Sequence, residues 1–189
     1  MIDPDAVIVG AGPAGLACAA SLLQRGLRAV ILEKADSVGS VWRRHYERLH
    51  LHTDRGHSAL PGLPMPRSYP RYPTRAQVVA YLESYATAFD LRPVFHSTVE
   101  HVGRDGYAWQ VEATSGRYSA PVAIIATGWA DFPHLPHWPG QHDYRGQIIH
   151  SSAYRNPAPD AGQRVLVVGF GNSAGEIPLS ADLSLPVKI

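Results

Sequence analysis

Short apolar runs alternate with a helical pattern at the start of the chain. Residues 6–9 (AVIV) and 28–32 (RAVIL) are rich in β-branched and other apolar side chains, which predicts two buried strands. Between them, residues 14–24 combine small residues with leucine and stop before Gly26, as is typical of a helix. This order predicts one strand–helix–strand unit.

A basic and proline-rich segment follows over residues 40–74. Its prolines cluster from Pro61 to Pro73, and because proline fixes φ and lacks an N–H donor, we expect an extended, irregular segment without regular helix. Helical spacing returns over residues 75–90, where the apolar side chains share one face. We expect this helix to pack that face on the core.

The remaining apolar runs are short. They predict strands at residues 94–102, 107–113, 117–119, 122–126 and 164–168, with a proline-rich linker at residues 132–139. Strands that alternate with helices are the pattern of a parallel sheet covered by helices. The predicted fold class is therefore α/β, doubly wound and Rossmann-type.

A glycine-rich motif joins the first strand to the first helix. Gly10, Gly12 and Gly15 have GxGxxG spacing, which allows a tight turn, close approach of a pyrophosphate, and close packing of the helix on the strand. Glu33 follows the second strand, where a carboxylate can bind a ribose 2′-hydroxyl and disfavour a 2′-phosphate. The motif predicts FAD or NAD; a turn with no ligand is the alternative.

A second, similar motif lies near the other end of the chain. Gly169, Gly171 and Ala174 follow the strand predicted at residues 164–168. Two dinucleotide sites are what a protein needs to pass hydride from a nicotinamide to a flavin. The strand that would read the second ribose is absent from the sequence, so this site is at best half present, and a structural turn stays open as the alternative.

Composition and charge narrow the class of function. The chain has 189 residues and a net charge of +1, so it lacks the basic surplus that nucleic acid would require. No apolar run reaches the ~20 residues of a membrane span. The only cysteine, Cys18, cannot form an internal disulfide, and no basic leader precedes an apolar stretch, so we expect a cytoplasmic protein.

With these motifs in place, the chain resembles the N-terminal part of the flavin-containing monooxygenases, most closely their YUCCA-like and bacterial members. The first glycine motif with Glu33, the GSVW stretch at residues 39–42 and the stretch IIATGWADFPHLP are similar to that family. Residues 144–154 (YRGQIIHSSAY) fit its FxGxxxHxxx(Y/F) fingerprint at Gly146, His150 and Tyr154. Without the resemblance, these three residues would be interpreted as a turn, a satisfied polar residue and a packing aromatic.

The resemblance implies two cofactors, FAD and NADPH. The residues implied for FAD are Gly10, Gly12, Pro13, Ala14, Gly15, Glu33, Lys34, Val41, Trp42, Thr127 and Gly128. The residues implied for NADPH are Gly169, Gly171, Asn172, Ser173 and Ala174. In this family NADPH reduces FAD, dioxygen adds to the reduced flavin as a hydroperoxide, and one oxygen atom passes to a small organic substrate.

One residue is a candidate for the catalytic pocket. His52 corresponds to the place where animal members of the family carry an active-site Asn, so the resemblance implies that it lines the flavin pocket. His50 and His52 could also begin a metal site, but no third ligand has suitable spacing, and we predict no metal. The nearby arginines, such as Arg48 and Arg55, suit either a phosphate or a solvated surface.

The resemblance also sets the expected domains. Residues 1–139 would be a FAD-binding domain without its C-terminal part, and residues 140–189 a linker with the fingerprint and the beginning of an NADPH-binding domain. Disulfide reductases share this plan but need two thiols, which one cysteine cannot supply. Pro178 and Pro186 would break or kink a helix after the second motif. A truncated, non-catalytic flavin-binding remnant is the alternative, and homo-oligomer formation through uncovered sheet edges stays open.

Overall fold

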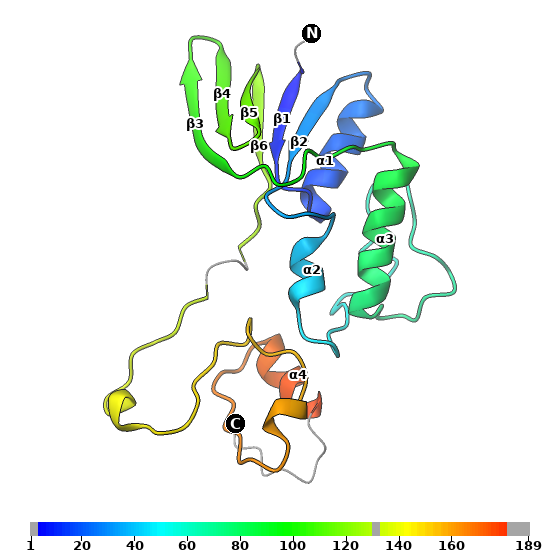
Figure 1. The fold of residues 1–189 in the computed structure, drawn as a ribbon. Helices are drawn as coiled ribbons and strands as arrows, with labels where there is room; N and C mark the ends of the chain where they lie inside the picture. Colours follow the sequence, from blue (N-terminus) through cyan, green and yellow to red (C-terminus); the bar gives the residue numbers. More distant parts are fainter. Residues whose placement is uncertain (1–3, 130–132, 181–189) are drawn as a thin grey trace.

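A three-stranded parallel sheet forms the centre of the fold. The computed structural model describes residues 4–129 and 133–180 (Figure 1). Strands β1 (Ala6–Val9), β2 (Ala29–Leu32) and β6 (Val122–Ile125) lie in the order β2-β1-β6. Val9 pairs with both Leu32 and Ile125. The three strands therefore end at the same level, and the residues that follow them meet at one edge of the sheet.

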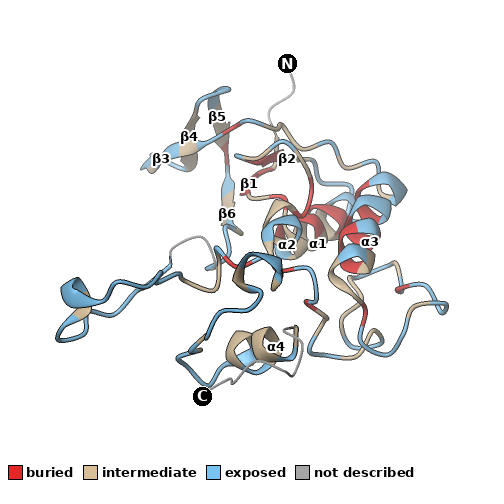
Figure 2. Ribbon diagram, turned by 60° about the horizontal axis from the view of Figure 1, so that its bottom comes forward, coloured by how far each residue is buried: buried red, intermediate tan, exposed pale blue. Residues whose placement is uncertain are grey.

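Helices cover one face of this sheet. Helix α1 (Pro13–Leu23) connects β1 to β2, α2 (Ser40–Arg44) is short, and α3 (Arg75–Ala88) lies beside α1 (Figure 1). Thr74 begins α3 with a capping box that it shares with Gln77. The buried side of α3 is the predicted one, and buried residues gather where α1 and α3 face each other (Figure 2). This apolar packing is the larger core.

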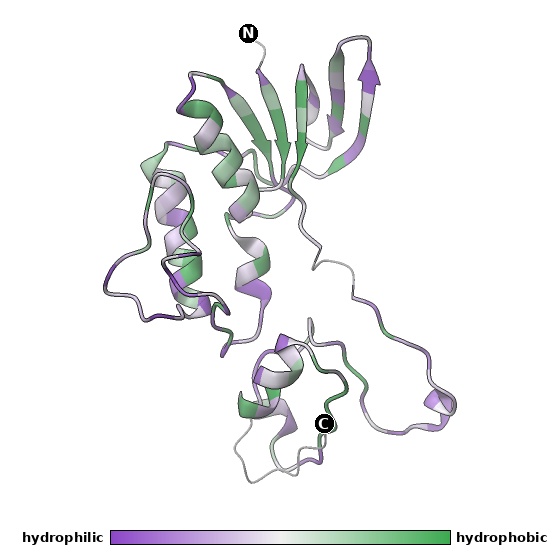
Figure 3. Ribbon diagram, turned by 180° about the vertical axis from the view of Figure 1, so that it is seen from behind, coloured by the Kyte–Doolittle hydropathy of each residue, from purple (hydrophilic) through white to green (hydrophobic). Residues whose placement is uncertain are grey.

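A small antiparallel sheet covers the other face. Strands β3 (Val99–Asp105), β4 (Ala108–Ala113) and β5 (Gly116–Ala120) lie in the order β3-β4-β5. Val7 and Leu32 of the parallel sheet pack against Val111 and Ala120 of this sheet. The central strands are apolar along their length, whereas polar residues interrupt β3 and β4 (Figure 3). Burial on both faces explains why β1 is entirely apolar.

The segment of residues 133–180 extends away from these layers. It contains two 3₁₀ turns (Gln141–Asp143 and Ala158–Asp160) and helix α4 (Asn172–Ser180) (Figure 1). A separate apolar cluster formed by Tyr46, Leu49 and Tyr154, with Trp42 and Ile177 against it, joins α4 to the segment after α2. Among the described helices, none is both long and apolar enough to cross a membrane.

Several predicted boundaries were wrong. A helix, α2, forms at the start of the segment predicted to be irregular, because the prolines that exclude helix begin only at Pro61. The strand predicted from residue 94 begins at Val99. Val94 makes a single parallel bridge to Leu32, and His96 then takes a φ of +53°, which interrupts the extended backbone. The predicted strand at residues 117–119 is β5, longer by two residues in total.

The predicted strand at residues 164–168 is also wrong. The structure assigns no strand there, and Leu166, Val168 and Phe170 are 64%, 68% and 98% exposed. An apolar run forms a strand only beside another strand. Leu166 makes an isolated bridge, and the described residues extend it into no ladder. Helix α4 contains Pro178 rather than ending at it, and Pro186 and part of the predicted linker at 132–139 lie outside the described residues.

Candidate dinucleotide-binding site

The predicted FAD residues converge at the carboxyl edge of the parallel sheet. Gly10 follows β1, Glu33 follows β2, and Thr127 and Gly128 follow β6. The Gly10 N–H donates to the Leu32 carbonyl at 2.7 Å, so the pairing continues one residue past the strands. Ligands of open α/β sheets bind outside the carboxyl ends of the strands. The site is therefore where this fold class would place it.

Two glycines of the first motif are required by the fold itself. Gly10 has a φ of +109°, and a Cβ there would lie 2.5 Å from the Ala126 carbonyl oxygen. A Cβ on Gly15 would overlap the Gly10 carbonyl oxygen, so Gly15 lets α1 pack directly on the turn after β1. Both positions exclude a side chain whether or not a ligand is present.

Gly12 differs from these two glycines. Its φ of −79° and ψ of −176° suit any residue, and a Cβ there would meet no atom within 4 Å. It begins α1, has no side-chain cap, and is followed by Pro13 at the first helical position. Among the described residues, nothing gives Gly12 a reason to lack a side chain. A pyrophosphate at the helix N-terminus would supply that reason, so the residues present fit a dinucleotide.

Glu33, which follows β2, is hydrogen-bonded to the glycine-rich turn after β1. Its side chain is buried, with 6% of the residue exposed. One carboxylate oxygen accepts from the Ala11 N–H at 2.7 Å and the other from the Ala35 N–H at 2.9 Å. Each oxygen retains a second lone pair, which a ribose hydroxyl can use. The sequence predicts the ribose role of Glu33 but gave no sign that it also fixes the glycine turn.

The GSVW stretch lies next to the glycine turn. The Gly39 N–H donates to the Ala11 carbonyl at 3.3 Å, and α2 then begins at Ser40. Val41 and Trp42 are half-buried along this helix. Of the other predicted FAD residues, those that are exposed at the edge of the site are Ala14, Lys34, Thr127 and Gly128. The predicted set is thus brought together around α1 and α2.

His52 and the second motif form a separate group. Asn172, at the start of α4, approaches His52 Nδ1 with its side-chain nitrogen at 2.9 Å, and Glu176 lies 3.1 Å from His52 Nε2. The Tyr46 hydroxyl donates to Glu176 at 2.9 Å. Burial, then the hydrogen bond to Glu176, raises the pKa of Tyr46 to about 12. Neither Tyr46 nor Glu176 was predicted from the sequence, although Glu176 lies one helical turn after Asn172.

The three fingerprint residues are not brought together. Gly146 lies beneath the Tyr144 ring, which occupies the space where a Cβ would lie. His150 Nδ1 accepts from the Ser152 N–H at 3.1 Å. Tyr154 alone reaches α4, through a 2.6 Å hydrogen bond with Ser180.

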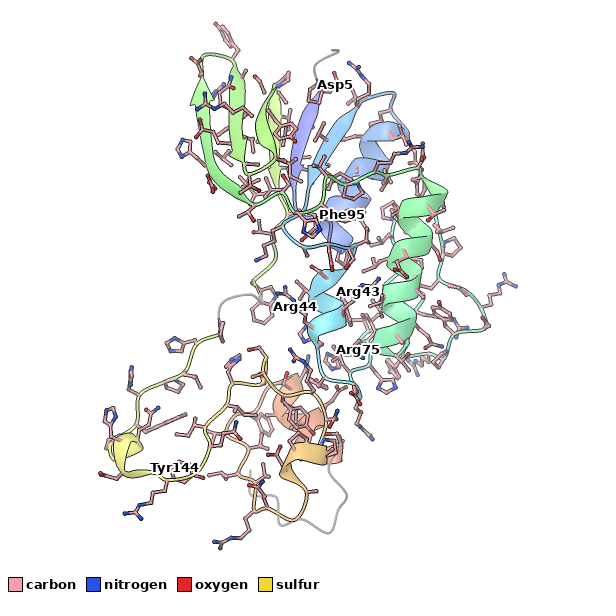
Figure 4. The ribbon with its side chains drawn as sticks, in the orientation of Figure 1. Asp5, Arg43, Arg44, Arg75, Phe95 and Tyr144 are labelled. Atoms are coloured by element: carbon pink, nitrogen blue, oxygen red, sulfur yellow. The ribbon has the colours of Figure 1, made fainter. Side chains whose placement is uncertain are left out.

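Basic residues surround the junction of α2 and α3. Arg43 and Arg44 lie on α2 and Arg75 lies at the start of α3 (Figure 4). Arg75 donates to the His45 carbonyl at 2.6 Å, and Arg43 pairs with Glu83 of α3. Burial lowers the pKa of His45 below 6.5, and the charges of Arg155, Arg44 and Arg75 lower it further.

These charges make the region beside α2 favourable for an anion. The part of the chain that the structure describes holds no group of three metal-ligating side chains.

Comparison with known proteins identifies relatives with the same plan. Residues 7–181 match the profile of the pyridine nucleotide-disulphide oxidoreductases. The chain is 46% identical over 180 residues to indole-3-pyruvate monooxygenase YUCCA1 of Oryza sativa subsp. japonica and 42% identical over 179 residues to probable indole-3-pyruvate monooxygenase YUCCA4 of Arabidopsis thaliana. Each match covers 93% of this chain and 44% of the relative. The chain thus spans less than half the length of these relatives.

A solved structure agrees with the sequence relatives. The flavin-containing monooxygenase from Stenotrophomonas maltophilia superposes with a TM-score of 0.90 at 36% identity, covering 99% of this chain and 57% of that protein. The resemblance to flavin monooxygenases that the motifs predicted is confirmed, and so is the Rossmann-type fold.

Proposed function

We propose, on the premise that this chain belongs to the pyridine nucleotide-disulphide oxidoreductase family, that it is the FAD-binding part of an NADPH-using flavin monooxygenase. The observation that carries the proposal is Gly12, which lacks a side chain at the N-terminus of α1 although neither its backbone nor its neighbours require this. A bound pyrophosphate explains that absence. The similarity to flavin monooxygenases, at 36% to 46% identity, supports FAD as the dinucleotide.

Different residues of this chain would bind different parts of FAD. The free N–H groups at the start of α1 would bind the pyrophosphate, and the second lone pairs of Glu33 would accept from a ribose hydroxyl. Val41 and Trp42 would lie toward the flavin side and help to exclude water. FAD, when bound, supplies the redox chemistry through which NADPH and dioxygen are used. His52 remains a predicted pocket residue.

The substrate class is a small organic molecule. Because the two plant relatives are named for indole-3-pyruvate, an aromatic 2-oxo acid is the first substrate that we would test. An anionic substrate would also suit the basic surroundings of α2. We further propose a cytoplasmic location, for which a single cysteine and the use of NADPH are the supporting arguments, and self-association through the exposed apolar residues.

A second candidate function, flavin binding without catalysis, is supported by a separate observation. Before the second motif, Leu166 and Val168 are largely exposed and no named strand forms, so the described residues provide only a turn and a helix of an NADPH site. A flavin-binding role without catalysis in the isolated chain is consistent with this. Anaerobic reduction distinguishes the two candidates.

The experiment begins with the purified chain and added FAD. We expect stoichiometric FAD and a yellow protein after removal of free cofactor. On anaerobic addition of NADPH, bleaching whose rate increases linearly with NADPH concentration would indicate a competent but weak second site. A flavin that NADPH never reduces would favour the non-catalytic candidate. A chain that retains no FAD would contradict both.

A further inference from the structure

Helix α4 presents one face to the segment that follows α2. The residues on this face, at helical spacing, are Asn172, Ser173, Glu176, Ile177 and Ser180. Ile177 packs against the Tyr46 cluster, and Ser180 is hydrogen-bonded to Tyr154 at 2.6 Å. The helix that carries the second glycine motif is therefore docked on the FAD side of the molecule by specific side chains.

Glu176 lies at the centre of this contact. Its Oε2 accepts from the Tyr46 hydroxyl at 2.9 Å, and its Oε1 lies 3.1 Å from His52 Nε2. The Glu176 side chain is 21% exposed and the His52 side chain 40% exposed, so the contact is partly shielded from water. One carboxylate thus holds two side chains that come from a different part of the sequence.

The contacts also determine where the imidazole proton lies. The side-chain nitrogen of Asn172 can only donate, so His52 Nδ1 accepts from it. His52 Nε2 then carries the proton and donates it to the Glu176 carboxylate. Both ring nitrogens are satisfied with the imidazole neutral, and the opposite tautomer would bring two N–H donors together at Nδ1.

We propose that Glu176 is a positioning residue, which holds His52 in its Nε2–H tautomer and locks the N-terminus of α4 against Tyr46. This inference rests on the proposed function for its biological role, because the nucleotide motif at the start of α4 would be aimed at the flavin side only while α4 is docked. A carboxylate suits the task, since it offers acceptors to two donors at once. A glutamine offers one acceptor and one donor, and alanine offers neither.

Two variants and one control test the proposal. Nitrogen-15 NMR of the purified chain, recorded where imidazole is neutral, reports the His52 tautomer, and His52→Asn identifies its signals. Hydrogen exchange reports the docking of α4. Glu112→Gln is the matched control, because Glu112 is a half-buried acid of β4 that pairs with Arg117.

We expect the parent chain and Glu112→Gln to show the Nε2–H tautomer with protected α4 amides. Glu176→Gln should give a mixture of tautomers, and Glu176→Ala should in addition raise exchange in α4 roughly 10-fold or more, the effect of losing hydrogen bonds to a charged acceptor. A merely structural role would change exchange without changing the tautomer in Glu176→Gln.

Three results would overturn the proposal. They are an Nδ1–H tautomer in the parent chain, an unchanged tautomer in both Glu176 variants, and unchanged α4 exchange in Glu176→Ala. FAD affinity is measured on the same samples. If the parent chain binds no FAD, the proposed function fails, whereas the tautomer and exchange results still decide the role of Glu176.

Discussion

Replacing Gly12 by valine tests whether FAD binding, rather than folding, requires a glycine at this position. The backbone at Gly12 has a φ of −79°, and the space beside it is open, so the unliganded chain should accept a valine without strain. We therefore expect the melting temperature of the FAD-free variant to stay close to that of the parent. The branched side chain would, however, occupy the approach of the pyrophosphate to α1.

The expected loss of affinity follows from the contacts that the valine blocks. The start of α1 offers N–H groups without a side-chain cap, and a hydrogen bond to a charged group contributes about 1.5–3 kcal/mol. Losing two such bonds would cost roughly 3–6 kcal/mol, which raises the dissociation constant of FAD by a factor on the order of 10²–10⁴. Quenching of flavin fluorescence during titration measures this change.

A second glycine serves as the control for the effect of adding a valine side chain. Gly175, within α4, also has open space around its Cβ position and lies outside the first motif, so Gly175→Val should leave FAD affinity unchanged. If the Gly12→Val variant binds FAD as tightly as the parent, the pyrophosphate does not lie beside Gly12. A large drop in the melting temperature of Gly12→Val would refute the argument that only the ligand requires this glycine.

Four further outcomes follow from the same structure. Glu33→Ala should weaken FAD binding by about 1–3 kcal/mol and also lower the melting temperature, because it removes an acceptor from the Ala11 N–H; titration and thermal melts measure both. Gly15→Ala should destabilise the FAD-free chain by about 1–3 kcal/mol in urea unfolding, since its Cβ would push α1 from the turn. Tyr46, with its pKa raised to about 12 from 10.0, favours the folded state below pH 10, and this contribution is lost as the pH rises toward 12; unfolding curves of Tyr46→Phe should lack that loss. The FAD-loaded chain should oxidise NADPH only weakly, and robust, substrate-stimulated oxidation followed by nicotinamide absorbance would contradict this.

The first strand–helix–strand unit could be predicted from sequence because its determinants are local. Residues 6–9 are apolar because both faces of β1 are covered, and the glycines at 10 and 15 mark a turn that tolerates no Cβ. The helix predicted over residues 75–90 forms as Arg75–Ala88, and its apolar face is the face that is buried.

The features that could not be predicted from the sequence depend on contacts between residues that are distant in the chain. The run at residues 164–168 has a strand pattern, but a strand exists only when another strand pairs with it. Glu33 was predicted to bind ribose, yet its contact with Ala11 appears only once β1 and β2 are adjacent. The bridge from Glu176 to Tyr46 and His52 spans more than 120 residues, and no local periodicity signals it.

A crystal structure of the chain with FAD would show whether the first glycine motif binds the pyrophosphate. We expect the pyrophosphate to lie at the N-terminus of α1 beside Gly12, and a ribose hydroxyl to donate to Glu33. NADP in that position, or FAD bound elsewhere with the space beside Gly12 filled only by water, would contradict this expectation.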